Sequence, residues 1–89
     1  MTCRHWEHLT TTDLADGAYR NAVAVLPVAA VEQHGPHLPL GTDAILTDGV
    51  LDAALQCLPD TVDVLRLPTQ RIGLSPEHAN FAGTLSFDA

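Results

Sequence analysis

Acidic and imidazole side chains gather in one short stretch of this sequence, the twelve residues from Glu32 to Asp43. The stretch contains Glu32, His34, His37 and Asp43, and it follows directly after an apolar run. Carboxylate and imidazole ligands together suit Zn²⁺, Mn²⁺ or Fe²⁺ better than Ca²⁺ or Mg²⁺. Because no cysteine lies beside them, a catalytic metal site is favoured over a closed structural one.

The spacing suggests which of these side chains meet. If the preceding strand continues through Glu32 and His34, their side chains point to the same side, because side chains alternate along a strand. Asp43 would arrive at a helix N-terminus, where the helix dipole favours a carboxylate. Its two oxygens could bridge two ions about 3.5–4 Å apart. We therefore predict Glu32, His34 and Asp43 as metal ligands and His37 as a residue that supports them.

A simpler interpretation of the same residues stays open. His34 could be a loop histidine that is hydrogen-bonded to Glu32 or Asp43, and Asp43 could only cap its helix. A second polar cluster, formed by Ser75, Glu77 and His78, lies in a long loop and could contact a substrate. Since no G-x-S-x-G context surrounds Ser75, a nucleophilic serine is not expected. The alternative is that Glu77 and His78 hydrogen-bond within their own loop.

The apolar pattern predicts the elements that position these residues. Residues 22–31 are apolar on both faces, as in a strand buried inside a parallel sheet, with an irregularity expected at Pro27. Residues 42–58 have helical periodicity, residues 62–67 form a second strand, and residues 68–82 form a long loop. Strand, helix and strand in this order predict a βαβ unit with a parallel sheet. In such sheets ligands bind beyond the carboxyl ends of the strands.

Two helices of different length are predicted. In the long helix the apolar face consists of Leu46, Val50, Ala53, Ala54 and Cys57. The polar face, which is expected to point away from it, consists of Thr47, Asp48, Asp52 and Gln56. A shorter helix is predicted within residues 6–16, capped by Thr11 or Thr12.

Charge and composition exclude several classes of function. The chain has eleven acidic residues against four arginines and no lysine, which gives a formal charge of −7. This balance argues against binding to nucleic acid or to an anionic membrane. The two cysteines, Cys3 and Cys57, are far apart in sequence and are expected to be reduced thiols, with a surface disulfide as the alternative. With no signal peptide and no apolar span, a cytoplasmic location is expected.

The string from Leu26 to Asp43, LPVAAVEQHGPHLPLGTD, resembles the N-terminal signature of the creatininase (creatinine amidohydrolase) family. A second string, SPEHANFAGTLS at 75–86, resembles the second motif of that family. Two differences are Ala29, where glycine is common, and Ala82, where proline is common. The resemblance implies a three-layer α/β/α sandwich with a mainly parallel sheet, of which this chain holds the first βαβ portion.

The resemblance also implies a mechanism. Glu32 and His34 would each bind one of two divalent ions, Zn²⁺ and/or Mn²⁺ with Fe²⁺ as an option, and Asp43 would bridge them. Ser75 falls near a position that contacts substrate in the family. The remaining ligands and the catalytic acid–base residues would lie downstream of residue 89. Residues 1–89 are thus expected to be the N-terminal part of a single metal-hydrolase domain, which assembles as a homo-hexamer when complete.

We therefore predict a metal-dependent hydrolase that cleaves the C–N bond of a small cyclic or linear amide with metal-activated water. Other substrates of the family are alternatives: a formamide intermediate of flavin or deazaflavin biosynthesis, a cofactor-precursor peptide, or an inosose ring. The pair Glu77 and His78 resembles those branches more than creatininase proper. A further alternative is an inactive fragment that serves only as a structural or oligomerisation module.

Overall fold

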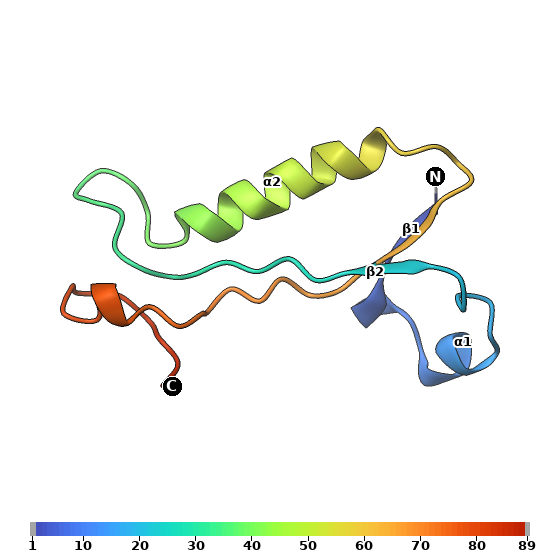
Figure 1. The fold of residues 1–89 in the computed structure, drawn as a ribbon, viewed down its shortest axis with the longest axis horizontal. Helices are drawn as coiled ribbons and strands as arrows, with labels where there is room; N and C mark the ends of the chain where they lie inside the picture. The colour runs from blue at the N-terminus through green and yellow to red at the C-terminus, as the bar shows by residue number, and fades with distance from the viewer. Residues whose placement is uncertain (1, 89) are drawn as a thin grey trace.

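The computed structural model of this chain describes residues 2–88 and has α/β architecture (Figure 1). Strands, helices and short 3₁₀ turns (η) follow in the order β1 (Thr2–His5), η1 (Trp6–His8), α1 (Thr11–Ala15), β2 (Val23–Val25), α2 (Thr42–Gln56), β3 (Asp63–Arg66) and η2 (Pro76–His78).

The strands form a parallel sheet in the order β1-β3-β2. The central strand pairs with both neighbours through Val64, which lies opposite Cys3 on one side and Val23 on the other. Val64 and Leu65 are buried, as expected for the strand with a partner on each edge. The succession β2, α2, β3 confirms the predicted βαβ unit and its parallel sheet.

The predicted strand over residues 22–31 is regular only in its first part. After Val25 the chain stays extended beside the segment that follows β3, and the two run together along α2 (Figure 1). Backbone hydrogen bonds continue there, from Gln70 to the Pro27 carbonyl (2.8 Å) and from Ala29 to the Gln70 carbonyl (2.8 Å). Pro27 has no N–H to give to a ladder, which is the physical reason for the irregularity expected at this residue.

Helix α2 has the predicted start and ends two residues early. Much of its apolar face is not covered by the sheet. Its apolar side chains Leu46 and Val50 are 60% and 68% exposed, and they border an apolar groove beside Val25. The acidic face, predicted to point away from the apolar face, packs on the molecule, because Asp48 and Asp52 contact the β3 side.

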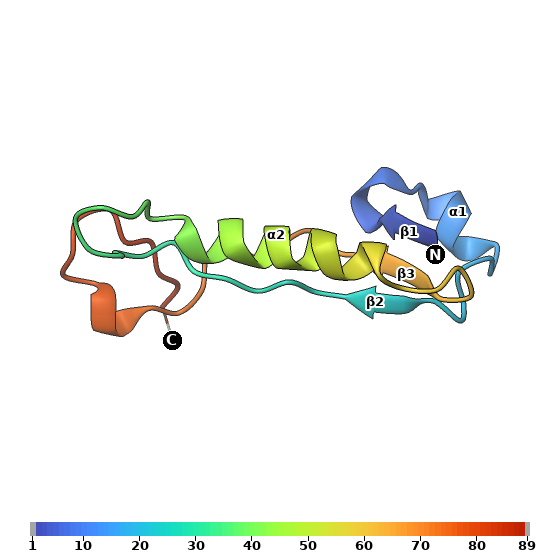
Figure 2. The same cartoon turned by 90° about the horizontal axis from the view of Figure 1, so that it is seen from above.

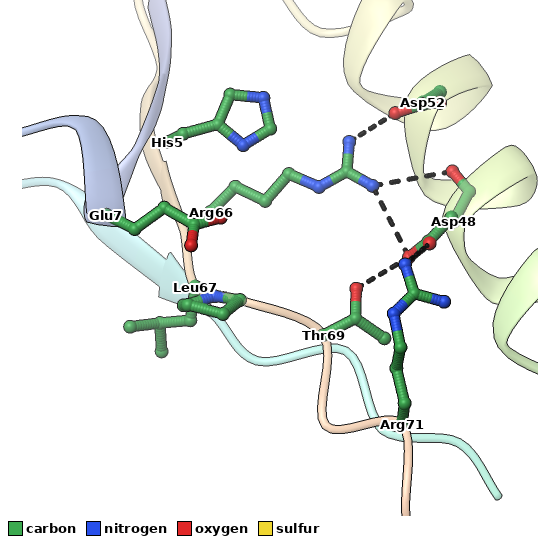
Figure 3. A pocket seen from close by; sticks show the side chains of 9 residues that line it. His5, Glu7, Asp48, Asp52, Arg66, Leu67, Thr69 and Arg71 are labelled. Atoms are coloured by element: carbon green, nitrogen blue, oxygen red, sulfur yellow. Dashed lines mark hydrogen bonds and ion pairs between the residues drawn. The ribbon is translucent and has the colours of Figure 1, made fainter. Parts of the chain in front are cut away.

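Figure 3 shows the charged contacts that set this orientation. The buried Arg66 of β3 pairs with Asp52 and lies 3.8 Å from Asp48. The Asp48 carboxylate also accepts hydrogen bonds from Thr69 Oγ1 (2.6 Å) and Arg71 Nη2 (2.7 Å). The Thr69 hydroxyl, and then the two arginines, hold the pKa of Asp48 below its ordinary value of 3.8, against the opposing effect of burial. These contacts join α2 to β3.

The N-terminal helix is shorter than predicted. Trp6–His8 form a separate 3₁₀ turn, and α1 begins after Thr10 rather than after Thr11 or Thr12. Thr10 is the N-cap residue because it forms a reciprocal capping box with Asp13. Its hydroxyl accepts from the Asp13 N–H (3.1 Å), while the Asp13 carboxylate accepts from the Thr10 N–H (2.9 Å).

Both cysteines carry free thiols. Across residues 2–88, every helix is too short or too polar to cross a lipid bilayer.

Candidate metal centre

The predicted site residues lie at one end of the molecule, opposite the end that carries β1 and α1 (Figures 1 and 2). They come from the loop before α2 and from the segment around η2. Backbone contacts bring these two segments together: the Leu85 N–H donates to the Val31 carbonyl (2.9 Å), and the Gln33 N–H donates to Thr84 Oγ1 (3.2 Å). The premise of a continuous strand through Glu32 and His34 is wrong, since β2 ends at Val25 and Val31 forms only an isolated bridge.

His34 and Asp43 are in direct contact, with 3.0 Å between His34 Nε2 and Asp43 Oδ1. The other ring nitrogen, Nδ1, lies 2.9 Å from the backbone carbonyl of Glu32. A carbonyl oxygen can only accept, so Nδ1 carries the proton in that bond. The Glu32 carbonyl is the main cause that raises the pKa of His34 above 6.5, with smaller contributions from the Asp43 carboxylate and the Glu32 charge, while burial acts in the opposite sense.

Glu32 presents a buried oxygen that lacks a partner. Its side chain is 14% exposed, and Oε2 has no hydrogen bond from any group among residues 2–88. The nearest imidazole nitrogen is His78 Nε2 at 3.6 Å, which is beyond hydrogen-bond distance. A buried carboxylate oxygen without a donor is costly, so this atom calls for a cation or a proton donor.

Two sets of possible ligands share Glu32. One oxygen each of Glu32 and Glu77 and one nitrogen of His78 lie within 4.8 Å of one another, a spacing that an ion could occupy. The predicted set joins Glu32 instead to His34 and Asp43, and the charge of Glu32 acts on the His34 ring. Both sets offer carboxylate and imidazole donors, so the donor chemistry and the unpartnered Glu32 oxygen fit a divalent transition metal ion.

The other predicted residues have different surroundings. His37 is exposed in the loop before α2, and among residues 2–88 its ring forms no hydrogen bond with Glu32, His34 or Asp43. Ser75 is only 1% exposed, and its backbone N–H donates to Ser86 Oγ (2.8 Å). Ser86 therefore joins the two ends of this loop. The roles predicted for His37 and Ser75 stay predictions.

Sequence reasoning overlooked Gln33 and Thr84. Gln33 lies between two predicted ligands, and its side-chain nitrogen is 2.9 Å from His78 Nδ1. The available signal was its position in a loop dense in ligand-type residues, since an amide there can orient a neighbouring imidazole.

A polar pocket lies elsewhere, between α2, β3 and the N-terminal segment (Figure 3). Its arginines are already paired with its aspartates. The arginines of this pocket therefore have no unpaired charge for a ligand, and the candidate site remains the one around Glu32.

Comparison with known proteins identifies the family. A sequence model of creatininase, described as creatinine amidohydrolase, matches residues 7–89, which is nearly the whole chain. The chain belongs to the creatininase family. This confirms the resemblance found in the two motifs and accounts for the parallel α/β unit as the N-terminal part of that fold.

Curated relatives add a more specific similarity. The chain is similar to mycofactocin precursor peptide peptidases of Mycolicibacterium smegmatis (38% identity over 66 residues), Mycobacterium ulcerans (40% over 73) and Mycobacterium tuberculosis (43% over 68). The matches cover 72%, 73% and 70% of this chain, and 27%, 28% and 27% of those proteins. The chain thus spans about a quarter of their length.

The family consists of amidohydrolases and peptidases that depend on a pair of metal ions. The relatives found are named as peptidases of a precursor peptide, a substrate class that was an alternative in our sequence interpretation.

Proposed function

We propose that this chain supplies the first ligands of a two-metal hydrolase that cleaves an amide bond in a peptide. The observation that carries the proposal is the environment of His34. Its Nδ1–H is held by the Glu32 carbonyl, so Nε2 has its lone pair directed at Asp43 Oδ1, 3.0 Å away. Two acceptors at that distance repel unless a proton or a metal ion lies between them or beside them. A ligating histidine commonly donates its other N–H to a carbonyl in this way.

The roles follow from the positions of the donor atoms. Glu32 and His34 would each hold one ion, and Asp43, with two oxygens at the start of α2, would contact both. When bound, the two ions would supply Lewis-acid activation of water and of the amide carbonyl. The Glu32 backbone carbonyl orients the His34 ring. The Glu32 carboxylate lies in a poorly solvated place, where its attraction for a cation is stronger than in water.

The proposed substrate is a peptide rather than a small cyclic amide. The similar mycobacterial proteins are named as peptidases of a cofactor-precursor peptide, which supports this class for the present chain. The general acid that protonates the leaving nitrogen is expected from chain downstream of residue 89.

The test uses the intact protein expressed from its natural reading frame, loaded with Zn²⁺ or Mn²⁺. Metal content is measured by elemental analysis, and cleavage of the mycofactocin precursor peptide and of creatinine is followed by mass spectrometry and colorimetry. We expect Asp43→Asn to lose most of the bound metal and to lower cleavage by at least about 100-fold, since a residue needed for the metal centre is removed. Asp63→Asn makes the same chemical change on an exposed strand residue and should leave both unchanged. Full metal content in Asp43→Asn would contradict the proposal.

A further inference from the structure

The two histidines of the site contact different kinds of partner through the same ring atom. His34 Nδ1 lies against a backbone carbonyl, which only accepts. His78 Nδ1 lies 2.9 Å from the side-chain nitrogen of Gln33, which only donates. His78 Nδ1 must therefore accept, and a neutral His78 ring then carries its proton on Nε2. His34 has the opposite arrangement, with its proton on Nδ1.

The tautomer of His78 depends on which way the Gln33 amide points. A contact of the amide oxygen with Gly35 fixes that orientation. The Gly35 N–H donates to Gln33 Oε1 (2.9 Å), so the oxygen faces Gly35 and the NH₂ group faces His78. Turning the amide over would bring two N–H donors together at Gly35. The Gln33 backbone is also fixed, because its N–H donates to Thr84 Oγ1.

His78 Nε2 lies near Glu32 Oε2, the one buried side-chain oxygen among residues 2–88 without a hydrogen-bond partner. The two atoms are 3.6 Å apart, slightly beyond hydrogen-bond distance. A ring nitrogen that carries a proton cannot bind a metal ion. With its proton on Nε2, His78 can donate to Glu32 but cannot bind the ion through that nitrogen. The Gln33 contact that sets this tautomer therefore excludes His78 Nε2 as a metal ligand.

We propose that Gln33 is a positioning residue that holds His78 as the Nε2–H tautomer, so that His78 donates to Glu32 Oε2 and is not a metal ligand. This rests on the proposed function, in which Glu32 is a ligand, and it adds which of the two histidines binds the ion. The oxygen Oε1 of Glu32 is then left for the metal. The cluster of Glu32, Glu77 and His78 is an orienting group beside the metal centre and not a third ion site.

The test is nitrogen NMR of the histidine rings in the intact, metal-free protein, with spectra recorded at increasing pH until the ring signals no longer change. Ring ¹⁵N shifts report which nitrogen carries the proton, and His34→Asn and His78→Asn assign the signals. We expect Nε2–H for His78 and Nδ1–H for His34. Gln33→Glu replaces the donor with an acceptor, so it should convert His78 to Nδ1–H. Gln56→Glu adds the same charge on an exposed helix position and should leave His78 unchanged.

Zinc addition completes the experiment. In the wild type, His34 Nε2 should shift on Zn²⁺ binding while His78 keeps its Nε2 proton. Gln33→Glu should keep its bound zinc but lose about tenfold in kcat with little change in KM, which a collapse of the fold would not produce. Nδ1–H at His78 in the wild type, an unchanged tautomer in Gln33→Glu, or zinc on His78 Nε2 would each overturn the proposal. Failure of the wild type to bind zinc would contradict the proposed function instead, and the metal-free tautomers would still decide the role of Gln33.

Discussion

Gly35 holds a backbone conformation on which its neighbours in the site depend. Its φ is +76°, in the left-handed region that side chains other than glycine adopt at a cost of about 1–2 kcal/mol. In this conformation its N–H reaches Gln33 Oε1, which fixes the side-chain amide with its nitrogen toward His78. The glycine of the His-Gly-Pro sequence therefore has a conformational role in the site.

Replacing this glycine should be costly, in contrast to a glycine elsewhere. We expect Gly35→Ala to lower the free energy of unfolding by about 1 kcal/mol because the residue keeps a positive φ. Gly49→Ala is the matched control. Gly49 lies inside α2 with no atom near an added Cβ, so the change should stabilise the helix by up to about 1 kcal/mol. Urea unfolding of the intact protein measures both, and an equal sign for the two would contradict this assignment.

Glu32 illustrates a conflict between stability and metal binding. In the metal-free protein the nearest donor to its buried Oε2 is His78 Nε2, 3.6 Å away, so the buried charge is at best partly compensated. We expect Glu32→Gln to raise the stability of the metal-free protein by about 1 kcal/mol, because a neutral amide is less costly to bury than a carboxylate. The same change should abolish the stabilisation that added Zn²⁺ gives to the wild type. Thermal unfolding with and without EDTA tests both, and a metal-free variant less stable than the wild type would contradict the first expectation.

For single residues, the sequence predicted which side chains belong to the site but not all of their contacts. His34 and Asp43 were expected to meet, and they do, because only a short loop separates them. Gln33 and His78 are 45 positions apart, and their contact depends on the isolated pairing of Val31 with Leu85. No local pattern in the sequence predicts that pairing.

Helix α2 owes its orientation to charge as well as to apolar surface. Asp48 and Asp52 pack toward β3 because the buried Arg66 must be neutralised there. The bounds of the helix followed from its periodicity, which depends only on neighbouring residues. The face that contacts the sheet did not follow, because the arginines that attract it, Arg66 of β3 and Arg71 beyond it, lie 14 or more residues later.

The network around Asp48 makes stability depend on pH in a defined direction. The folded pKa lies below the ordinary value of 3.8, so the carboxylate stabilises the fold at higher pH, and this contribution is lost as the pH falls below 3.8 through the folded pKa. We expect Asp48→Asn to lower the free energy of unfolding by about 1 kcal/mol at pH 6. The deficit should shrink at pH 3, where the wild-type carboxylate begins to be protonated. Urea unfolding at the two pH values measures it, and a deficit that does not change with pH would show that charge is not the cause. The exposed Asp63→Asn serves as control.

The whole chain is a long, thin body, with Cα extents of 47 × 28 × 17 Å. The sheet lies at one end and the candidate metal site at the other, joined by two extended segments along α2 (Figures 1 and 2). The sequence predicted the βαβ unit at this scale but not the elongation, since apolar runs were taken as regular strand beyond Val25. The homo-hexamer predicted from the family resemblance stays a prediction, and sedimentation velocity of the intact protein tests it.

The most direct test of the central claim is the position of the metal itself. Crystals of the intact protein grown with Zn²⁺ allow anomalous scattering at the zinc edge to locate each ion independently of any assumed ligand. The account predicts an ion about 2.0–2.2 Å from His34 Nε2 and from an oxygen of Asp43, with Glu32 as a further ligand. A zinc peak bound to Glu77 and His78, with His34 still hydrogen-bonded to Asp43, would contradict it.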